Sequence, residues 1–236
     1  MNTIILQPDQ FLSENEAVLN PRQADHLRRV LKPAPDTRLH VGRLDGLLGD
    51  ALSVDAGDSV YLRDIALYRR SPPQLPLTLF LALPRPQMLK RILQLVATYG
   101  VERLILFQSH RVEKSYWQTP SLQAHAVWEQ LLLGLEQANA TQMPECHCVK
   151  YFRELCEDWL PRYCPQAMNY VAHPGDFDLC PSAWPASETT FAIGPEGGFT
   201  QAEFACFREM GFSPVQLGQR ILKVEQAVNC VLARLM

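Results

Sequence analysis

The pattern of hydrophobic and polar positions changes character near residue 70. Before it, short alternating runs such as "TIILQ" (3–7) and "LGDALSVDAGDSVYLRDIALY" (48–68) are separated by Asp-Gly and Gly-Asp turns. This spacing predicts a small antiparallel barrel. One helix should interrupt it at "PRQADHLRRVLK" (21–32), with Asn20 as its cap and Pro21 at its first position.

A proline-rich connector, "RRSPPQLP" (69–76), separates this part from the rest of the chain. Two adjacent prolines with a third nearby make a stiff, extended segment, and such segments often join domains. We therefore expect an N-terminal domain over residues 1–70 and a C-terminal domain over residues 74–236.

From residue 75 onward, strands and helices alternate. "LPLTLFLAL" (75–83) is an almost unbroken apolar run, which is typical of a strand covered on both faces. A helix from Pro86 to Tyr99 should follow and end at Gly100. The next buried strand, "VERLILFQ" (101–108), completes a βαβ unit.

The middle of the C-terminal domain carries weaker signals. Thr119 is a candidate cap for a long helix beginning at Pro120. Strands are expected at "CHCVK" (146–150) and "MNYVA" (168–172), with a helix between them from about residue 151 to about 160.

The last fifty residues have the most regular pattern. Thr200 and Glu203 have the spacing of a capping box for a helix to about residue 210. Two strands and a closing amphipathic helix are expected at "TTFAI" (189–193), "FSPVQLG" (212–218) and "KVEQAVNCVLARL" (223–235). The C-terminal domain is therefore predicted to be α/β with a mainly parallel sheet.

Composition narrows the class of protein. The 236 residues are 47% hydrophobic, and no stretch approaches the roughly 20 uncharged apolar residues that span a bilayer. The N-terminal residues lack a basic segment followed by a long apolar one. We therefore expect a soluble cytoplasmic protein without membrane insertion.

The cysteines do not suggest a disulfide framework or a metal centre. Seven cysteines are an odd number, and none forms a Cys-x-x-Cys pair. Cys146, His147 and Cys148 are adjacent, but neighbouring positions on a strand point to opposite faces. Reduced thiols and no bound metal are the expectation.

Charge is distributed unevenly along the chain. The formal net charge of −3 excludes a general nucleic-acid coating protein, which would be basic overall. Residues 85–114, in contrast, hold 6 Lys and Arg against 2 Asp and Glu. Any RNA contact should therefore be local, although an ordinary solvated surface would explain the same composition.

A glycine-rich turn, "IGPEGGF" (193–199), joins a predicted buried strand to a predicted helix N-terminus. Such a turn can bind phosphate through free N–H groups and the helix dipole. Here, however, Glu196 would stand where a pyrophosphate sits, and two like charges about 4 Å apart cost about 1 kcal/mol even in water. A neutral or cationic ligand fits this turn better.

A second glycine turn, "QLGQRIL" (216–222), follows the next predicted strand. Turns after successive parallel strands lie at the same carboxyl edge of a sheet, where ligands bind. Gly218 would allow close backbone approach, and Ile221 with Leu222 would form an apolar wall for a flat group. The alternative is that both turns are tight connections without a ligand.

Both turns resemble the signature stretches of the RsmE family of ribosomal RNA methyltransferases. The matching segments are "IGPEGGFTQAEF" (193–204) and "LGQRILKVEQAV" (217–228). The resemblance continues upstream in "HLRRVLK" (26–32), "LALPRPQMLKRILQLVATYGVERLILF" (81–107) and "LEQANATQMP" (135–144). It thus covers nearly the whole chain in the right order.

This resemblance implies a fold, a cofactor and a reaction. Family members have an N-terminal PUA-like RNA-binding barrel and a C-terminal SPOUT domain with a deep trefoil knot. They are homodimers that bind S-adenosylmethionine at the knot. They methylate N3 of one uridine in 16S ribosomal RNA, which leaves free rRNA and the assembled small subunit as candidate substrates.

The resemblance also implies roles for individual residues. The cofactor would lie against three loops: the end of "NYVAHP" (169–174) and the two glycine turns. The implied cofactor-binding residues are Ala172, His173, Gly194, Glu196, Gly197, Gly198, Leu217, Gly218, Ile221 and Leu222. The implied catalytic residues are Arg220, for the uridine or its phosphate, and Glu225, as an orienting group or base. Further expected RNA contacts are Arg28, Arg29 and Lys223, together with Arg85 and Arg111 of the basic segment 85–114, for which an ordinary surface or a dimer-supporting role is the alternative.

The chain departs from the family pattern at a few positions. Lys223 stands where the family has arginine, and Val224 and Gln226 stand where it has threonine. Ala140 stands where an arginine is expected. Replacing arginine with lysine loses bidentate hydrogen bonding. A catalytically inactive RNA-binding or ribosome-assembly protein that retains the fold is therefore one alternative, and an α/β enzyme for a small metabolite is another.

Overall fold

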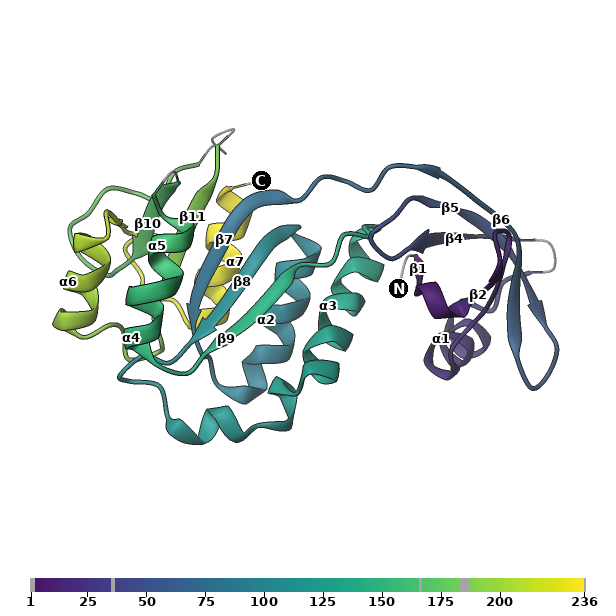
Figure 1. Ribbon diagram of the computed structural model, residues 1–236, viewed down its shortest axis with the longest axis horizontal. Coiled ribbons are helices and arrows are strands. Elements are labelled where there is room, and N and C mark those ends of the chain that lie inside the picture. The colour runs from purple at the N-terminus through teal and green to yellow at the C-terminus, as the bar shows by residue number, and fades with distance from the viewer. Residues whose placement is uncertain (1–2, 35–36, 166, 183–186, 236) are drawn as a thin grey trace. The chain divides into compact units, whose positions relative to one another are not determined.

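The computed structural model describes residues 3–34, 37–165, 167–182 and 187–235. The chain forms two compact units (Figure 1). Unit 1 comprises Met1–Pro73 and Leu132–Met143, and unit 2 comprises Gln74–Leu131 and Pro144–Met236. All seven cysteines are free thiols. Within the described residues, no helix is both long enough and apolar enough to cross a bilayer.

Unit 1 is built on a sheet with the strand order β1-β4-β5-β6-β3-β2. The strands are β1 (Ile4–Leu6), β2 (Phe11–Ser13), β3 (Glu16–Val18), β4 (Arg38–Arg43), β5 (Leu48–Asp55) and β6 (Val60–Arg69). The expectation of a wholly antiparallel sheet is wrong for one pair, because β1 runs parallel to β4. Two strands and a helix lie between β1 and β4 in the chain, and this long connection lets β4 return in the same direction.

The helix of unit 1 begins as predicted. Asn20 accepts a hydrogen bond from the Gln23 backbone, and Pro21 is the first residue of α1 (Pro21–His26). The chain then continues as a π-helical turn, Leu27–Leu31. The core of the unit consists of buried apolar residues from the strands and this helix, among them Ile4, Leu6, Leu27, Val41, Val60 and Leu62.

Residues 132–143 belong to unit 1 through a buried carboxylate. Glu136 is fully buried and accepts two hydrogen bonds from the Arg22 guanidinium, at 2.9 and 2.7 Å. The Thr3 backbone N–H donates to the Glu136 carbonyl at 3.1 Å, and the Thr141 hydroxyl donates to the Gly46 carbonyl at 2.6 Å. No local pattern in the sequence indicated that this segment joins the first unit.

Unit 2 contains a second sheet in which every strand pair is parallel, so the predicted α/β fold with a parallel sheet is confirmed. Its strand order is β12-β10-β11-β7-β8-β9. The strands are β7 (Leu75–Ala82), β8 (Val101–Phe107), β9 (Glu145–Val149), β10 (Met168–Ala172), β11 (Thr189–Ile193) and β12 (Ser213–Val215). Residues 77–82 of the central β7 are all buried, as expected for a strand covered on both faces.

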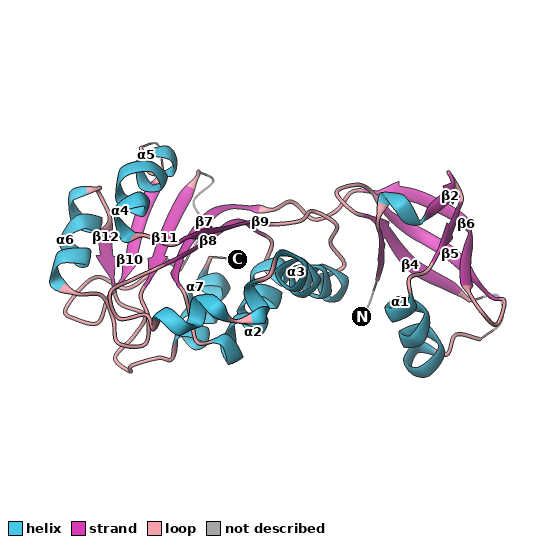
Figure 2. Cartoon of the chain, turned by 60° about the horizontal axis from the view of Figure 1, so that its bottom comes forward, coloured by secondary structure: helices cyan, strands magenta, loops and turns pink. Residues whose placement is uncertain are grey.

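Helices cover both faces of this sheet, with α2 and α7 on one face and α4 to α6 on the other (Figure 2). The helices of unit 2 are α2 (Pro86–Thr98), α4 (Phe152–Glu154), α5 (Leu160–Tyr163), α6 (Gln201–Glu209) and α7 (Val224–Arg234). A further helix, α3 (Ala124–Ala138), begins in unit 2, and its residues from 132 onward belong to unit 1. A π-helical turn, Leu155–Trp159, joins α4 to α5 and carries this helical segment beyond the expected end near residue 160.

The predicted start of the long helix is wrong. Thr119 accepts from the Ser121 N–H and caps only a 3₁₀ turn, Pro120–Leu122. Gln123 is extended, with φ −62° and ψ 139°, and this residue interrupts the helical hydrogen bonds before α3 begins at Ala124. The capping box at Thr200 and Glu203, in contrast, is confirmed.

Candidate functional site

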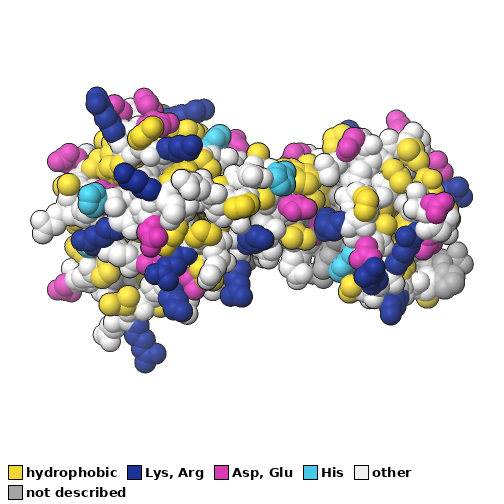
Figure 3. All heavy atoms as spheres, turned by 90° about the horizontal axis from the view of Figure 1, so that it is seen from below, with side chains coloured by type: hydrophobic (Ala, Val, Ile, Leu, Met, Phe, Trp, Pro, Cys, Tyr) yellow, Lys and Arg dark blue, Asp and Glu magenta, His cyan; other side chains and the backbone are white. Residues whose placement is uncertain are grey.

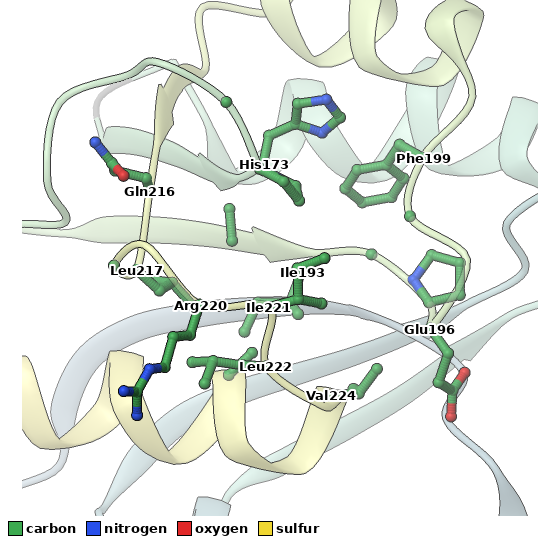
Figure 4. A pocket seen from close by; sticks show the side chains of 18 of the residues that line it. His173, Ile193, Glu196, Phe199, Gln216, Leu217, Arg220, Ile221, Leu222 and Val224 are labelled. Carbon is green, nitrogen blue, oxygen red and sulfur yellow. The ribbon is translucent and has the colours of Figure 1, made fainter.

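A cavity of about 250 Å³ lies where β10, β11 and β12 end (Figure 4). Parallel pairing brings these ends level, because Ala172 on β10 is opposite both Ile193 on β11 and Val215 on β12. Three loops therefore meet at one carboxyl edge, which is where a parallel sheet offers a ligand site. The predicted proximity of the two glycine turns is confirmed, with β10 lying between their strands.

The cavity brings together all but one of the predicted cofactor residues. Its lining includes Ala172, His173, Gly194, Glu196, Gly198, Leu217, Gly218, Ile221 and Leu222, together with Arg220. The sequence interpretation missed other lining residues, among them Pro174, Gly175, Phe199, Gln216, Val224 and Ala227. Val224 and Ala227 belong to the buried face of α7, so helical spacing alone marked them as core rather than as part of a site.

The first glycine turn is tightly folded. Gly198 has φ +70° and donates its N–H to the Pro195 carbonyl at 2.8 Å. Phe199 folds back over Gly194, where an added Cβ would lie 3.3 Å from the ring. Phe199 in turn packs on Phe207 of α6, with ring centroids 4.9 Å apart. The positive φ at residue 198 thus favours glycine, and the Phe199 ring leaves little room for a side chain at residue 194.

Gly197 is the predicted cofactor residue that does not line the cavity. Its carbonyl accepts a hydrogen bond from the Arg111 guanidinium. A Cβ at residue 197 would lie 3.1 Å from Cδ of Arg111. Arg111, expected as an RNA contact, therefore lies against the glycine turn.

The second glycine turn is anchored at its start and open at its tip. Gln216 donates from its side chain to the Phe177 carbonyl at 2.6 Å and from its backbone to the Asp178 carbonyl at 2.9 Å. Farther along, Gly218 has φ +135° and open space around it, and Ile221 is 93% exposed. In Figure 4 the guanidinium of Arg220 points toward α7 and away from His173.

An aromatic cluster supports the loop that follows β10. The His173 ring stacks on Phe204 of α6 with centroids 4.2 Å apart, and Phe177 meets both rings edge-on or tilted. Burial lowers the pKa of His173, because desolvation disfavours the charged imidazolium. The cavity is therefore bordered by a neutral imidazole at neutral pH.

A second cavity, of about 330 Å³, shares Glu196 with the first. It is lined by Arg85, Gln87, Met88, Glu196, Lys223 and Glu225. Nε of Arg85 lies 3.6 Å from a carboxylate oxygen of Glu196. The structure thus brings Arg85, Lys223 and Glu225 together beside the main cavity. Both partners of the ion pair are partly exposed, so the pair contributes at most about 1 kcal/mol to stability.

The predicted RNA contacts of unit 1 are engaged by carboxylates. Arg28 donates to both oxygens of Asp55, at 2.9 and 2.6 Å, and to the Gly57 carbonyl. Hydrogen bonds from Arg28 and the Gly57 N–H lower the pKa of Asp55 to about 2. Arg29 pairs with Asp25 at 2.6 Å. The face seen in Figure 3 likewise intersperses Lys and Arg with Asp and Glu.

Known proteins resemble this chain in sequence. The model of a family described as the RNA methyltransferase domain matches residues 71–236. A ribosomal RNA small subunit methyltransferase E of Treponema pallidum is 28% identical, covering 96% of this chain and 87% of its own length. The protein of that name from Synechocystis is 27% identical, covering 98% of this chain and 76% of its own.

Solved structures share the fold over the full chain. The ribosomal RNA small subunit methyltransferase E of Neisseria gonorrhoeae, bound to S-adenosyl methionine, superposes with a TM-score of 0.74 at 21% identity. A Legionella pneumophila protein in complex with the cofactor SAM gives a TM-score of 0.74 at 22% identity. Both matches cover 99% of this chain, and 95% and 96% of the respective neighbours.

Proposed function

The chain belongs to the RNA methyltransferase domain family, and we propose that it transfers a methyl group from S-adenosylmethionine to small-subunit ribosomal RNA. The resemblance to the RsmE family is confirmed, because relatives of that name match nearly the whole chain. The observation that carries the proposal is the cavity at the ends of β10, β11 and β12, which contains most of the predicted cofactor residues.

The cavity has the chemistry that this cofactor needs. Leu217, Ile221 and Leu222 offer apolar contact to an adenine ring, and the glycines allow close approach to backbone donors and acceptors. Glu196 is the acidic residue at the border, and it faces Arg85 across 3.6 Å. We assign Glu196 the role of holding Arg85 beside the cofactor pocket.

The finer proposal is that N3 of a single uridine in 16S rRNA receives the methyl group. The cofactor supplies an electrophilic methyl group on a sulfonium. N3–H of uridine is a weak acid, so the protein must position the base in line with the methyl group and stabilise the charge that develops on it. Methyl transfer would form the N–C bond as the S–CH3 bond of the sulfonium breaks and leaves a neutral thioether, and a proton would have to leave N3.

Residues at the two cavities suit these tasks. Arg220 would bind the uridine or its phosphate through its planar guanidinium, and Glu225 would orient the base or take the proton. Arg85 and Lys223 line the same second cavity as Glu225, which supports placing the RNA backbone there. Arg28 and Arg29 would have to exchange their carboxylate partners for phosphate in order to contact RNA.

The wider architecture is also part of the proposal. Unit 1 would be a PUA-like RNA-binding barrel, and unit 2 a SPOUT domain with a trefoil knot at the cofactor site. Two copies of the chain would form a homodimer, and the substrate would be free 16S rRNA or the assembled small subunit. The full-length match to structures of the same fold supports the two-unit architecture within this proposal.

Two measurements test the proposed function. Calorimetry should detect S-adenosylmethionine binding to the purified protein, and lack of binding at millimolar cofactor would contradict the enzyme assignment. Mass spectrometry of 16S rRNA from a deletion strain should show the loss of one 3-methyluridine. If that base persists, the assignment of the substrate is wrong. Cofactor binding without turnover would instead identify the inactive RNA-binding alternative.

A further inference from the structure

The loop that follows β8 makes one contact to the first glycine turn and another to the start of α6, the helix that follows this turn. The His110 backbone N–H donates to Oε1 of Glu203 at 2.7 Å, and the neighbouring Arg111 guanidinium donates to the Gly197 carbonyl. In the sheet, β7 lies between β8 and β11, the strand that leads into the turn. The loop therefore reaches across the end of β7, and these contacts connect segments about ninety residues apart in the chain.

Glu203 joins these segments through its two carboxylate oxygens. Oε1 accepts from the loop, whereas Oε2 accepts from the Thr200 N–H at 2.8 Å and from the Thr200 hydroxyl at 3.0 Å. The residue is 5% exposed. Burial acts to raise the pKa of Glu203, but hydrogen bonds from the Thr200 and His110 backbones outweigh burial and hold the pKa below its ordinary value.

Arg111 holds the other side of the turn. Its guanidinium binds the carbonyl of Gly197, and its aliphatic stem lies against the same glycine. The residues on either side of Gly197, Glu196 and Gly198, both line the cavity. A shift of Gly197 would therefore displace two residues of the cofactor pocket.

We propose that Glu203 and Arg111 are positioning residues that hold the first glycine turn in its cofactor-binding conformation. Glu203 acts from the α6 side and Arg111 from the loop after β8. Neither residue lines the cavity, so both act through the turn. Holding a loop in its bound conformation raises affinity, because less entropy is lost on binding. This inference rests on the proposed function, and it gives Arg111 a role other than RNA contact.

Affinity for S-adenosylmethionine, measured calorimetrically without RNA, tests the proposal. Arg111→Ala and Glu203→Ala should each raise Kd about tenfold, as expected for the loss of hydrogen bonds to a charged group. Arg111→Lys should recover part of the affinity, because it keeps a donor near Gly197. The cofactor KM should rise in turnover assays, with kcat at saturating cofactor within about twofold of wild type.

Two exposed residues provide matched controls. Lys114→Ala removes a cation from the same basic segment, and Glu209→Ala removes an acid from the last turn of α6; both should leave cofactor Kd unchanged. If Arg111→Ala weakens RNA binding but not cofactor binding, Arg111 is an RNA contact and the proposal is wrong. Arg111 is exposed, so this variant remains informative even if Glu203→Ala folds poorly.

These measurements distinguish a failure of the proposed function from a failure of the positioning role of Glu203 and Arg111. A wild-type protein that binds no S-adenosylmethionine overturns both the proposed function and the positioning role. If the wild type binds and both variants bind equally well, the proposed function stands and the positioning role is overturned. Lower melting temperatures with unchanged Kd would likewise show that the two residues serve stability alone.

Discussion

The two glycine turns that border the cavity differ in how firmly the rest of unit 2 holds them. The first, residues 193–199, is tied to the loop after β8 by Arg111, and Glu203 ties the adjoining start of α6 to the same loop. The second, residues 216–222, is anchored at Gln216, whereas Ile221 near its far end is 93% exposed. One wall of the pocket is therefore braced, and the other is open.

This difference suggests that the two turns contribute to ligand binding in different ways. A braced wall receives a ligand with little loss of conformational entropy. An open wall loses more entropy when it orders, but it can cover the ligand with apolar surface in return. The open wall also carries Arg220, the proposed contact to the substrate. Substitution of Arg220 should therefore lower the rate of catalysis, whereas substitutions in the braced wall and in the apolar part of the open wall should weaken cofactor binding.

The largest effect is expected at the open wall, in catalysis rather than in binding. Arg220→Ala should lower kcat about 100-fold, because removing one donor that stabilises developing charge typically costs this much. Melting temperature should stay near its wild-type value, since Arg220 is exposed. Cofactor Kd should change less than kcat, because the guanidinium points away from His173 (Figure 4). Single-turnover kinetics on 16S rRNA provides the measurement, with Arg208→Ala as the exposed-arginine control. Unchanged kcat would remove Arg220 from the proposed mechanism.

The next effect concerns the braced wall and should appear in cofactor binding. Gly198→Val places a β-branched residue at φ +70°, where strain of about 2 kcal/mol would weaken cofactor binding about 30-fold. Calorimetry provides the measurement. Gly57→Val is the matched control, because Gly57 in unit 1 has φ +84° and open space around it. Equal Kd for the two variants would show that the turn is not a binding element.

A smaller effect is expected in the pH dependence of the free energy of unfolding. Glu203→Gln removes a carboxylate whose folded pKa is lowered, so wild type should be more stable than the variant by about 1.5 kcal/mol near neutral pH. This advantage should be full above the ordinary value of 4.5 and be lost as pH falls through the lower folded value. Denaturant unfolding at several pH values measures it. A stability difference that does not change with pH would contradict a stabilising role for the ionised Glu203 carboxylate.

The smallest effect should come from the apolar surface of the open wall. Ile221→Ser should weaken cofactor binding about fivefold, which corresponds to partial burial of one isoleucine side chain. Stability should not change, because the side chain is already 93% exposed in the free protein. Val30→Ser in unit 1, which is 64% exposed, tests the general effect of removing surface apolar area. If cofactor Kd is unchanged, the loop does not close over the ligand.

Local patterns in the sequence were sufficient to predict many of the strands and helices and the meeting of the two glycine turns. Apolar runs predicted the central strands, and the capping residues Asn20 and Thr200 correctly marked helix starts. The rule that parallel strands end at one edge also predicted that the two glycine turns would meet. These features depend on residues close together in the chain, so a pattern of a few residues carries the information.

Other features depend on contacts between residues far apart in the chain, and local patterns did not predict them. The tertiary structure placed residues 132–143 in unit 1 through Glu136 and Arg22, and it ran β1 parallel to β4. It also brought Arg111 to the Gly197 carbonyl, a contact that the sequence did not predict. Such contacts form only when segments far apart in the chain pack together, because the geometry of the whole unit decides which donor meets which acceptor. Local patterns along the chain thus define most of the elements and the sheet edge at which the two glycine turns meet, whereas tertiary packing selects the side chains that hold the first turn.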